Sequence, residues 1–350
     1  MNLQEILDKL SKNRVFRLSL TSQELFHSNF WGWLLDDDER WKNYSGLFDE
    51  NLPNLPKPKI LRGQNGLTLS LKFDDGLYII ENRLKSIIDK PQIESIWQDA
   101  DKKNLAPKKI LVITYPDLNF HNTNWSVEDD YDYKKSYNIQ TAYLTYEELL
   151  NRFKAQSITD RFLSEYIECL ELLISMKNSF KYTLEENCSA FWNFYGENRE
   201  KLLELDLDVM FQKASAANLV TKILQDTPYK EDIRVITGTD NERELPELQL
   251  WLHANDRLVE DIGISICGYE YRFCAYIFKE TDEGKNSDLR KKYSEKLQES
   301  KFKNLFNGTI KSIDYQLYSM LYTKEALIED ISIGALIEKI KSDLDTLHSL

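Results

Sequence analysis

The sequence predicts an α/β (α+β) protein in three parts: strands and helices over residues 1–155, a helical region over 156–228, and an α+β region over 229–350. Segments with a hydrophobic period of two alternate with helical segments in the first part, which is typical of mixed sheets flanked by helices. Helical periodicity then continues without a break, and strand-like runs return after Pro228. The 350 residues are 42% hydrophobic with only 12 Gly and 8 Pro. This composition favours a packed core and excludes a disordered or collagen-like chain.

The first two predicted elements are helices. Apolar residues recur at helical spacing over residues 3–10. Thr21 and Glu24 form a capping-box pattern ahead of a broad apolar face over residues 25–35. Because acidic residues at a helix C-terminus oppose the helix dipole, we expect this second helix to end before the acidic run that begins at Asp36.

A β-hairpin follows a proline-rich connection. Three prolines over residues 47–58 predict a loop or extended chain. Residues 67–73 alternate apolar and polar side chains, residues 74–76 read Asp-Asp-Gly, and residues 77–83 resume the strand pattern. This arrangement predicts two antiparallel strands joined by a tight turn. A helix is expected next, from residue 89, with its proline in the first turn.

The remaining elements follow from the same two periods. Residues 109–115 form a near-continuous apolar run, which predicts a strand covered on both faces. Residues 116–138 are polar and acidic and predict a long surface loop, with another strand over 141–146. Beyond these we expect helices over 147–153, 159–176, 185–205 and 209–225, strands over 233–237, 248–253, 259–266 and 271–278, and closing helices over 286–303 and 324–348.

Composition narrows the functional classes. No uninterrupted apolar run reaches the length of a membrane span, and the N-terminus has no basic start before an apolar run. We therefore expect neither a membrane partner nor visible export. The four cysteines are widely spaced and lack the spacing of a zinc site, which favours a reduced, cytoplasmic protein. The motifs that bind nucleotide phosphates are absent, so we expect no nucleotide cofactor.

The acidic character of the chain restricts binding of nucleic acid to a local basic surface. The net charge is −13, and a polyanion is held mainly by Lys and Arg contacts to phosphate. Residues 285–311 contain eight basic and three acidic residues, including Lys291 and Lys292. This segment is a candidate phosphate-binding surface. The alternative is a solvated helix face with local ion pairs.

The hairpin places four polar residues on one surface. Side chains alternate between the two faces of a strand. If the two-residue turn is 74–75 or 75–76, Thr68 lies opposite Glu81 or Arg83, and in both registers Ser70 shares their face. The opposite face is more apolar and is expected to be the core side.

Glu24 supplies a second carboxylate from the earlier helix, and two carboxylates from different elements suit Mg²⁺ or Mn²⁺. For Glu81, the alternative is an ordinary strand residue paired with Arg83 or a lysine.

Two runs and one further residue resemble a known family. Residues 24–36, ELFHSNFWGWLLD, resemble the E-x-x-H-S-x-x-(L/F)-x-W-L-L-D opening of a bacterial branch of the PD-(D/E)XK nuclease superfamily. Residues 78–86, YIIENRLKS, resemble its I-I-E-N-K-x-K-S signature, and Gln92 follows at the usual distance. The resemblance covers about residues 20–100. It implies a restriction-endonuclease-like core with a mixed sheet flanked by helices.

The same resemblance implies metal-dependent hydrolysis of a DNA phosphodiester, with Mg²⁺ or Mn²⁺ as cofactor. Glu24 corresponds to the helix carboxylate, Glu81 to the central metal ligand and Gln92 to a supporting polar group. Arg83 takes the place of the signature lysine, and both Arg83 and Lys85 are expected to contact DNA.

Thr68 and Arg83 depart from the family pattern. Thr68 stands where the family carries an aspartate, which removes one charged ligand. Arginine stays protonated at any working pH and therefore handles protons poorly, although its planar fork can clamp phosphate. The sequence thus predicts a weakened or eroded nuclease site. One alternative is an inactive nuclease fold that has no cofactor and serves to bind nucleic acid or protein. The other is an interaction scaffold whose C-terminal region binds a protein partner.

Overall fold

The computed structural model describes most of the chain as two compact units. The first comprises Met1–Phe180 and Glu197–Ser215, and the second Lys181–Gly196 and Ala216–Leu350. The three-part division predicted above stays a prediction. The mixed α/β class is confirmed, with one mixed and one antiparallel sheet. The described residues are 1–20, 23–64, 67–84, 90–115, 124–128, 136–179, 182–188, 198–240, 245–254, 259–278, 294–295, 297, 300–306, 309–314, 318–327 and 330–350.

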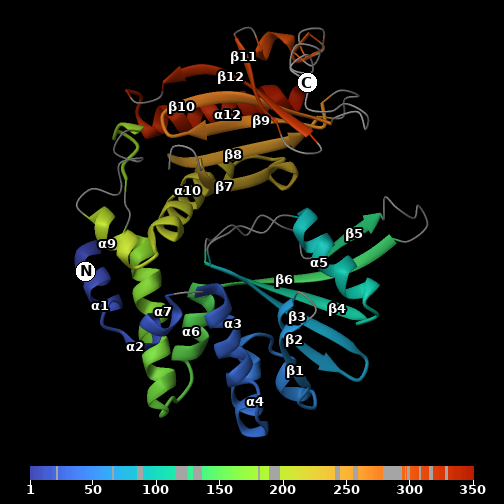
Figure 1. Ribbon diagram of the computed structural model, residues 1–350, viewed down its shortest axis with the longest axis vertical. Coiled ribbons are helices and arrows are strands. Elements are labelled where there is room, and N and C mark those ends of the chain that lie inside the picture. Colours follow the sequence, from blue (N-terminus) through green and yellow to red (C-terminus); the bar gives the residue numbers. More distant parts are fainter. Residues whose placement is uncertain are drawn as a thin grey trace. The chain divides into compact units, whose positions relative to one another are not determined.

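The first unit is built on a six-stranded mixed sheet in the order β1-β2-β3-β4-β6-β5 (Figure 1). Strands β1, β2 and β3 are antiparallel, β3, β4 and β6 are parallel, and β5 pairs antiparallel with β6. The strands are β1 (Lys59–Gln64), β2 (Leu67–Phe73), β3 (Gly76–Arg83), β4 (Pro107–Thr114), β5 (Asn124–Glu128) and β6 (Ser136–Thr145).

Helices cover both faces of this sheet. Helices α3, α6 and α7 lie on one side and α5 lies on the other (Figure 1). The first-unit helices are α1 (Leu3–Leu10), α2 (Arg14–Ser19), α3 (Gln23–Leu34), α4 (Asp38–Tyr44), α5 (Lys90–Lys102), α6 (Tyr146–Lys154), α7 (Arg161–Ser179) and α9 (Arg199–Glu204), with 3₁₀ turns η1 (Ser45–Leu47) and η2 (Leu52–Asn54); α10 (Asp208–Leu224) begins here and continues into the second unit.

Capping residues explain several helix boundaries. Helix α3 ends at Leu34, before the acidic run, as predicted. Asp37 then accepts a hydrogen bond from the backbone N of Arg40 at 2.8 Å and caps α4, a helix that the sequence analysis missed. A full capping box starts α6, where Thr145 and Glu148 bond reciprocally. The Thr21 pattern ahead of α3 lies outside the described residues.

The core of the first unit corrects one expectation about the hairpin. Leu77 and Ile79 share the face of Glu81 and are at most 1% exposed. They pack with Ile93 and Trp97 of α5 in one hydrophobic cluster. The face predicted to be polar is therefore apolar core along most of its length and polar only at its end, because α5 covers it. The opposite face is also buried, so the sheet is covered on both sides.

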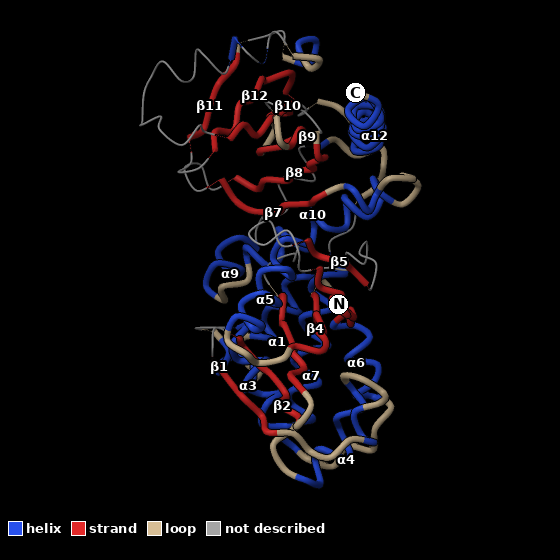
Figure 2. The backbone as a smooth tube through the Cα atoms, turned by 90° about the vertical axis from the view of Figure 1, so that its right-hand side faces the viewer, coloured by secondary structure: helices blue, strands red, loops and turns tan. Residues whose placement is uncertain are grey.

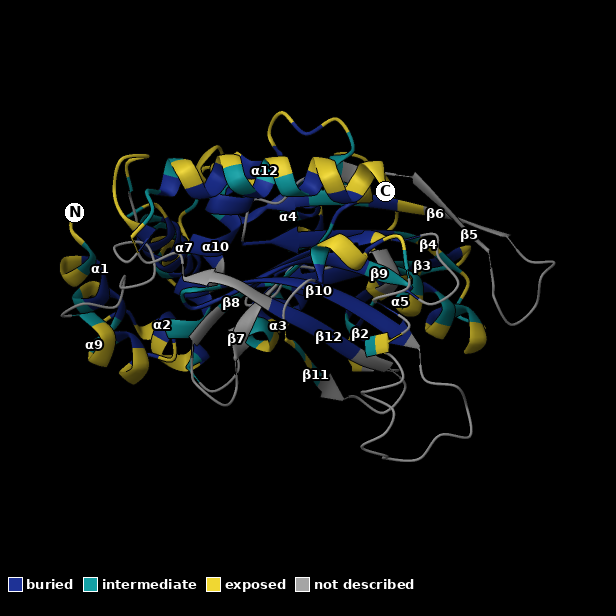
Figure 3. Cartoon of the chain, turned by 90° about the horizontal axis from the view of Figure 1, so that it is seen from above, coloured by how far each residue is buried: buried dark blue, intermediate teal, exposed yellow. Residues whose placement is uncertain are grey.

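The second unit contains a six-stranded antiparallel sheet in the order β11-β12-β10-β9-β8-β7 (Figure 2). Helix α12 (Ile333–Ser349) packs against β9 and turns its exposed side outward (Figure 3). The strands are β7 (Arg234–Asp240), β8 (Leu245–His253), β9 (Asp261–Cys267), β10 (Glu270–Phe278), β11 (Ile310–Asp314) and β12 (Tyr318–Leu327), with 3₁₀ turns η4 (Lys230–Asp232) and η5 (Lys303–Leu305).

The strand predictions over 233–278 are confirmed, but three other expectations were wrong. The predicted surface loop over 116–138 contains β5 and the start of β6, which pair with each other. The helix predicted over 185–205 does not begin at 185, because residues 185–187 form a turn and an isolated bridge, although residues 199–204 are helical in α9. The closing helix begins at Ile333, because residues 324–327 belong to β12.

No helix within the described residues is both long and apolar enough to cross a membrane. The four cysteines, Cys169, Cys188, Cys267 and Cys274, are buried as free thiols.

Candidate active site around Glu81

The hairpin register places Thr68 opposite Glu81. Phe73 pairs with Gly76, so Asp74 and Asp75 form the two-residue turn. This is the first of the two registers considered from the sequence. Strand β3 lies between β2 and β4, with Glu81 beside Val112 of the parallel neighbour. The carboxylate therefore sits near the C-terminal end of a central strand, on a rigid support.

Glu81 is ion-paired inside the protein. An Arg83 terminal nitrogen lies 3.0 Å from Glu81 Oε1, and the two side chains are only 21% and 11% exposed. The Thr68 hydroxyl donates a hydrogen bond to the backbone carbonyl of Ile80 at 3.5 Å, and its proximity to the Glu81 carboxylate lowers the pKa of Glu81. The alternative interpretation of Glu81, a strand residue paired with Arg83, is thus correct as a description of its contacts. It does not exclude a functional role, because both side chains keep some exposure.

The surroundings of Glu81 shift its pKa in both directions. Burial raises its pKa, and the nearby Glu24 carboxylate raises it further, whereas Arg83 and the nearby Thr68 hydroxyl lower it. The net pKa lies above the ordinary value for a glutamic acid. Glu24 lies at the start of helix α3, which is hydrogen-bonded to the end of β3, so the two predicted metal ligands lie in the same region.

Two hydrogen bonds anchor the start of α3 to the end of β3. The backbone N of Leu84 donates to Glu24 Oε1 at 3.1 Å. Asn82 Nδ2 donates to the backbone carbonyl of Glu24 at 2.8 Å. One bond holds the side chain of Glu24 and the other its backbone, so the position of the carboxylate is set by the strand that carries Glu81.

Asn82 is itself held by helix α6. Its Oδ1 accepts a hydrogen bond from the Tyr146 hydroxyl at 2.7 Å, and the residue is 2% exposed. Because Oδ1 accepts from Tyr146, the Nδ2 group is oriented toward Glu24. The sequence analysis missed this positioning role: Asn82 belongs to the same signature run as Glu81, but Tyr146 lies 64 residues further along the chain.

His27 is a packed residue rather than a ligand. It is 1% exposed, and burial lowers its pKa to about 3, so it is neutral. Its Nδ1 lies 2.9 Å from the Tyr166 hydroxyl, which accepts from Trp31 Nε1 at 2.8 Å. This network joins α3 to α7.

The other predicted site residues are less closely associated with Glu81. Gln92 lies in the first turn of α5 with an exposed side chain. Lys85, Lys291 and Lys292 lie outside the described residues. The geometry therefore joins Glu24, Thr68, Glu81 and Arg83 and leaves the expected roles of the other four residues as predictions.

The donor set can be compared with what a divalent cation needs. Glu24 and Glu81 supply carboxylate oxygens and Thr68 a hydroxyl. Mg²⁺ in phosphoryl-transfer sites commonly takes one or two carboxylates and completes its shell with water and substrate phosphate. The residues fit a cation of that kind, with the Arg83 charge opposing its binding. Within the described residues, no group of three or more His, Cys, Asp or Glu side chains is arranged to hold a metal ion.

A second, partly buried ionic cluster was also missed from the sequence. Asp49 Oδ2 accepts from the Tyr78 hydroxyl at 2.6 Å and from Lys109 Nζ at 2.7 Å. These contacts tie the segment after η1 to β3 and β4, at the end of β3 opposite Glu81. The cluster supports the sheet, and its partners are too distant in sequence for a local pattern to reveal it.

Comparison with known proteins adds no family assignment. No protein-family model, no curated protein and no solved structure matches the chain.

Proposed function

We propose that the chain is a protein of the PD-(D/E)XK nuclease superfamily that hydrolyses DNA phosphodiesters with Mg²⁺ or Mn²⁺ at a weakened site. The observation that carries the proposal is the pair of hydrogen bonds by which Asn82 Nδ2 and the backbone N of Leu84, at the end of the strand that carries Glu81, hold the backbone and the carboxylate of Glu24. The mixed sheet with helices on both faces is compatible with the restriction-endonuclease-like core that the sequence resemblance implies.

In this proposal Glu24 and Glu81 hold the cation. When bound, a divalent cation polarises the phosphate and lowers the pKa of an attacking water. Asn82 and the backbone N of Leu84 fix Glu24 relative to β3, so the spacing of the two carboxylates is set before substrate binds. Preorganisation of this kind partly compensates for the aspartate that Thr68 replaces.

Arg83 has two opposing effects. Its guanidinium neutralises Glu81 in the free protein, which weakens cation binding. When a phosphate enters, the planar fork can form two parallel hydrogen bonds to it, so that Arg83 exchanges a carboxylate for a phosphate partner. Because arginine remains protonated, it positions and stabilises the phosphate but takes no proton from water.

The test is cleavage of supercoiled plasmid and single-stranded DNA with Mg²⁺ and with Mn²⁺. We expect slow, metal-dependent cutting that Glu81→Gln abolishes and Glu24→Gln reduces. Glutamine keeps the size and hydrogen-bonding capacity of the side chain and removes the charge, so the folded variants isolate the carboxylate. Cutting that persists in both variants would show that the activity has another origin.

A second candidate is an inactive nuclease fold that binds nucleic acid. It is favoured by the Arg83–Glu81 ion pair, which already supplies a cation to the carboxylate, and by the neutral Thr68. This candidate predicts metal-independent DNA binding that weakens in Arg83→Gln, with no cutting by the wild type. Binding that requires Mg²⁺ would argue against it.

A further inference from the structure

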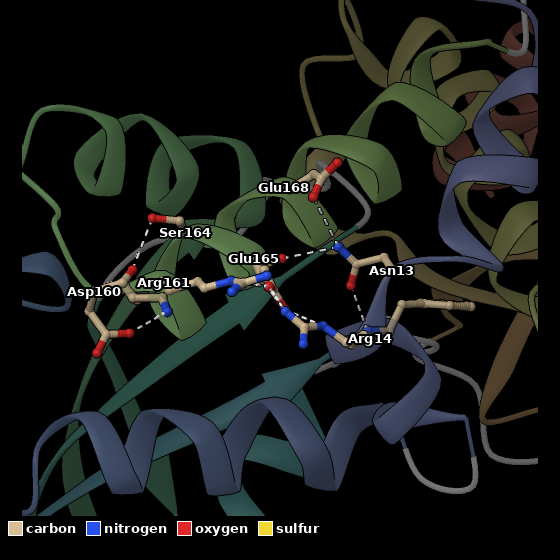
Figure 4. Close-up of polar contacts among 9 residues, drawn as sticks. Asn13, Arg14, Asp160, Arg161, Ser164, Glu165 and Glu168 are labelled. Carbon is tan, nitrogen blue, oxygen red and sulfur yellow. Dashed lines mark hydrogen bonds and ion pairs between the residues drawn. The ribbon is translucent and has the colours of Figure 1, made fainter.

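A pocket in the first unit lies apart from the Glu24–Glu81 pair. Its volume is about 370 Å³, within the range of small-ligand sites. Helix α2 and the first turns of α7 form its walls (Figure 4). The lining combines two arginines and one carboxylate with two apolar side chains: Arg14, Leu18, Arg161, Phe162 and Glu165.

The polar side of the pocket carries a surplus of positive charge. Arg14 binds Glu165 through Nε and a terminal nitrogen, and Arg161 Nε lies 3.3 Å from Glu165 Oε1 (Figure 4). One carboxylate therefore serves two guanidinium groups. The Arg14 and Arg161 side chains are 64% and 85% exposed, so further N–H groups are accessible to a ligand. Because Glu165 orients both arginines, less side-chain entropy is lost when an anion binds.

Acidic neighbours limit this surplus. Asp160 accepts from the backbone N of Leu163 and caps α7, and Glu168 accepts from Asn13 Nδ2 (Figure 4). Both carboxylates are engaged with uncharged donors close to the arginines. The local charge therefore suits one or two phosphates rather than a long polyanion track.

An aromatic row extends from the apolar side of the pocket. Phe162 is 38% exposed, although its ring contacts Phe30 and Trp33 at centroid distances of 5.5 and 5.6 Å. The Arg40 guanidinium lies 4.5 Å from the centre of the half-buried Trp33 ring. Arg40, which is paired with Asp37 at 2.7 Å, thus lies over Trp33, and two arginines line the same pocket as Phe162. We call these five residues, Arg14, Arg161, Phe162, Trp33 and Arg40, the arginine–aromatic row.

We infer that the arginine–aromatic row binds single-stranded nucleic acid, with a phosphate at Arg14 and Arg161 and a base against Phe162. Aromatic faces interleaved with arginines are the means by which proteins hold unpaired bases without reading sequence. An acidic peptide would satisfy the arginines but leave the exposed aromatic surface without a planar partner. The inference rests on the proposed function for its choice of nucleic acid. Trp33 lies nine residues after Glu24, about 14 Å along α3, so the two sites are separable.

The test is fluorescence anisotropy of a labelled 12-nucleotide oligo(dT) with the full chain. We expect Phe162→Ala to weaken binding about fivefold or more, as for loss of one stacked base. Arg161→Gln should weaken it roughly fourfold at 0.15 M salt and reduce the magnitude of the salt slope by about 0.7, as for loss of one phosphate contact. Phe162→Leu keeps an apolar side chain but removes the aromatic face, so it should resemble Phe162→Ala in binding while folding normally.

Two control variants remove an exposed apolar side chain and an exposed cation elsewhere in the unit. Leu203→Ala truncates an apolar side chain that is 51% exposed, and Lys154→Gln removes a cation from an exposed ion pair with Glu171. Both should bind oligo(dT) as the wild type does. Equal losses in controls and row variants would overturn the inference. The inference would also be overturned if the row variants lost binding to a labelled Phe-Glu₆ peptide but bound oligo(dT) as tightly as the wild type does.

Failure of the two proposals can be told apart. Glu81→Gln should lose cleavage and keep oligo(dT) binding at the row, because the row does not include Glu81. Absence of cutting with row-dependent binding would refute the nuclease proposal alone. Metal-dependent cutting with unchanged binding in Phe162→Leu and Arg161→Gln would refute the row alone.

Discussion

Replacing Arg83 with glutamine should tighten Mn²⁺ binding by about tenfold or more. An Arg83 terminal nitrogen lies 3.0 Å from Glu81 Oε1. A cation bound to that oxygen at about 2.1 Å lies at most about 5 Å from the nitrogen. With the dielectric constant of water, a double and a single positive charge at about 5 Å repel by about 1.7 kcal/mol. Since about 1.4 kcal/mol is a factor of ten in affinity, the repulsion accounts for at least that gain.

The assay is a Mn²⁺ titration followed by the electron paramagnetic resonance signal of the free ion. Arg234→Gln is the matched control, because Arg234 also lies 3.0 Å from a carboxylate, that of Asp261 in the second unit. It removes the same charge from the whole chain and should leave the affinity of the Glu81 site unchanged. Affinity that is unaltered or weaker in Arg83→Gln would refute the idea that Arg83 competes with the cation.

Three further predictions concern stability. The raised pKa of Glu81 means that the folded chain binds this proton more tightly, so stability is lost as pH rises from 4.5 through the folded value. The free energy of unfolding of Glu81→Gln, relative to that of the wild type, should therefore increase over that pH window by up to about 1.4 kcal/mol per pH unit. Urea denaturation measures this difference, and a difference that is independent of pH would contradict the prediction. Tyr146→Phe should lower the free energy of unfolding by about 1–2 kcal/mol, because it leaves the buried Asn82 Oδ1 without its donor. A loss below about 0.5 kcal/mol would show that this hydrogen bond contributes little. For Asp49, burial opposes ionisation, but hydrogen bonds led by that from Lys109 lower its pKa to about 2. Asp49→Asn should lower the free energy of unfolding by about 1–2 kcal/mol at neutral pH, after allowance for solvent screening. Thermal denaturation should show that this loss shrinks as pH falls from 3.8 toward 2.

The predictions from sequence succeeded where local patterns determine structure. The hairpin alternation, its Asp-Asp-Gly turn and the strand carrying Glu81 are all present. The side chains that share a face followed from strand geometry alone. Which face is buried did not follow, because that depends on the position of α5 in space, and Leu77 and Ile79 lie on the side that carries Glu81.

Long-range pairing explains the larger errors. Residues 324–327, Lys-Glu-Ala-Leu, have high helix propensity, yet they form the end of β12 beside β10. Strand pairing overrides propensity when a neighbouring strand supplies the hydrogen bonds. The pair Asn82 and Tyr146 is separated by 64 residues, and the pair Arg14 and Glu165 by 151. Neither contact leaves a periodic signal, so the support of Glu24 and the pocket on α7 emerged only from the folded chain.

The central claim is that Glu24 and Glu81 form one cation site, and Mn²⁺ stoichiometry tests it most directly. Binding would be measured for the wild type, Glu24→Gln, Glu81→Gln and the double variant at one ionic strength. We predict that Glu81→Gln loses one site, that Glu24→Gln weakens the same site, and that the double variant loses no more than Glu81→Gln does. Two sites lost independently, or no site lost in any variant, would contradict the claim.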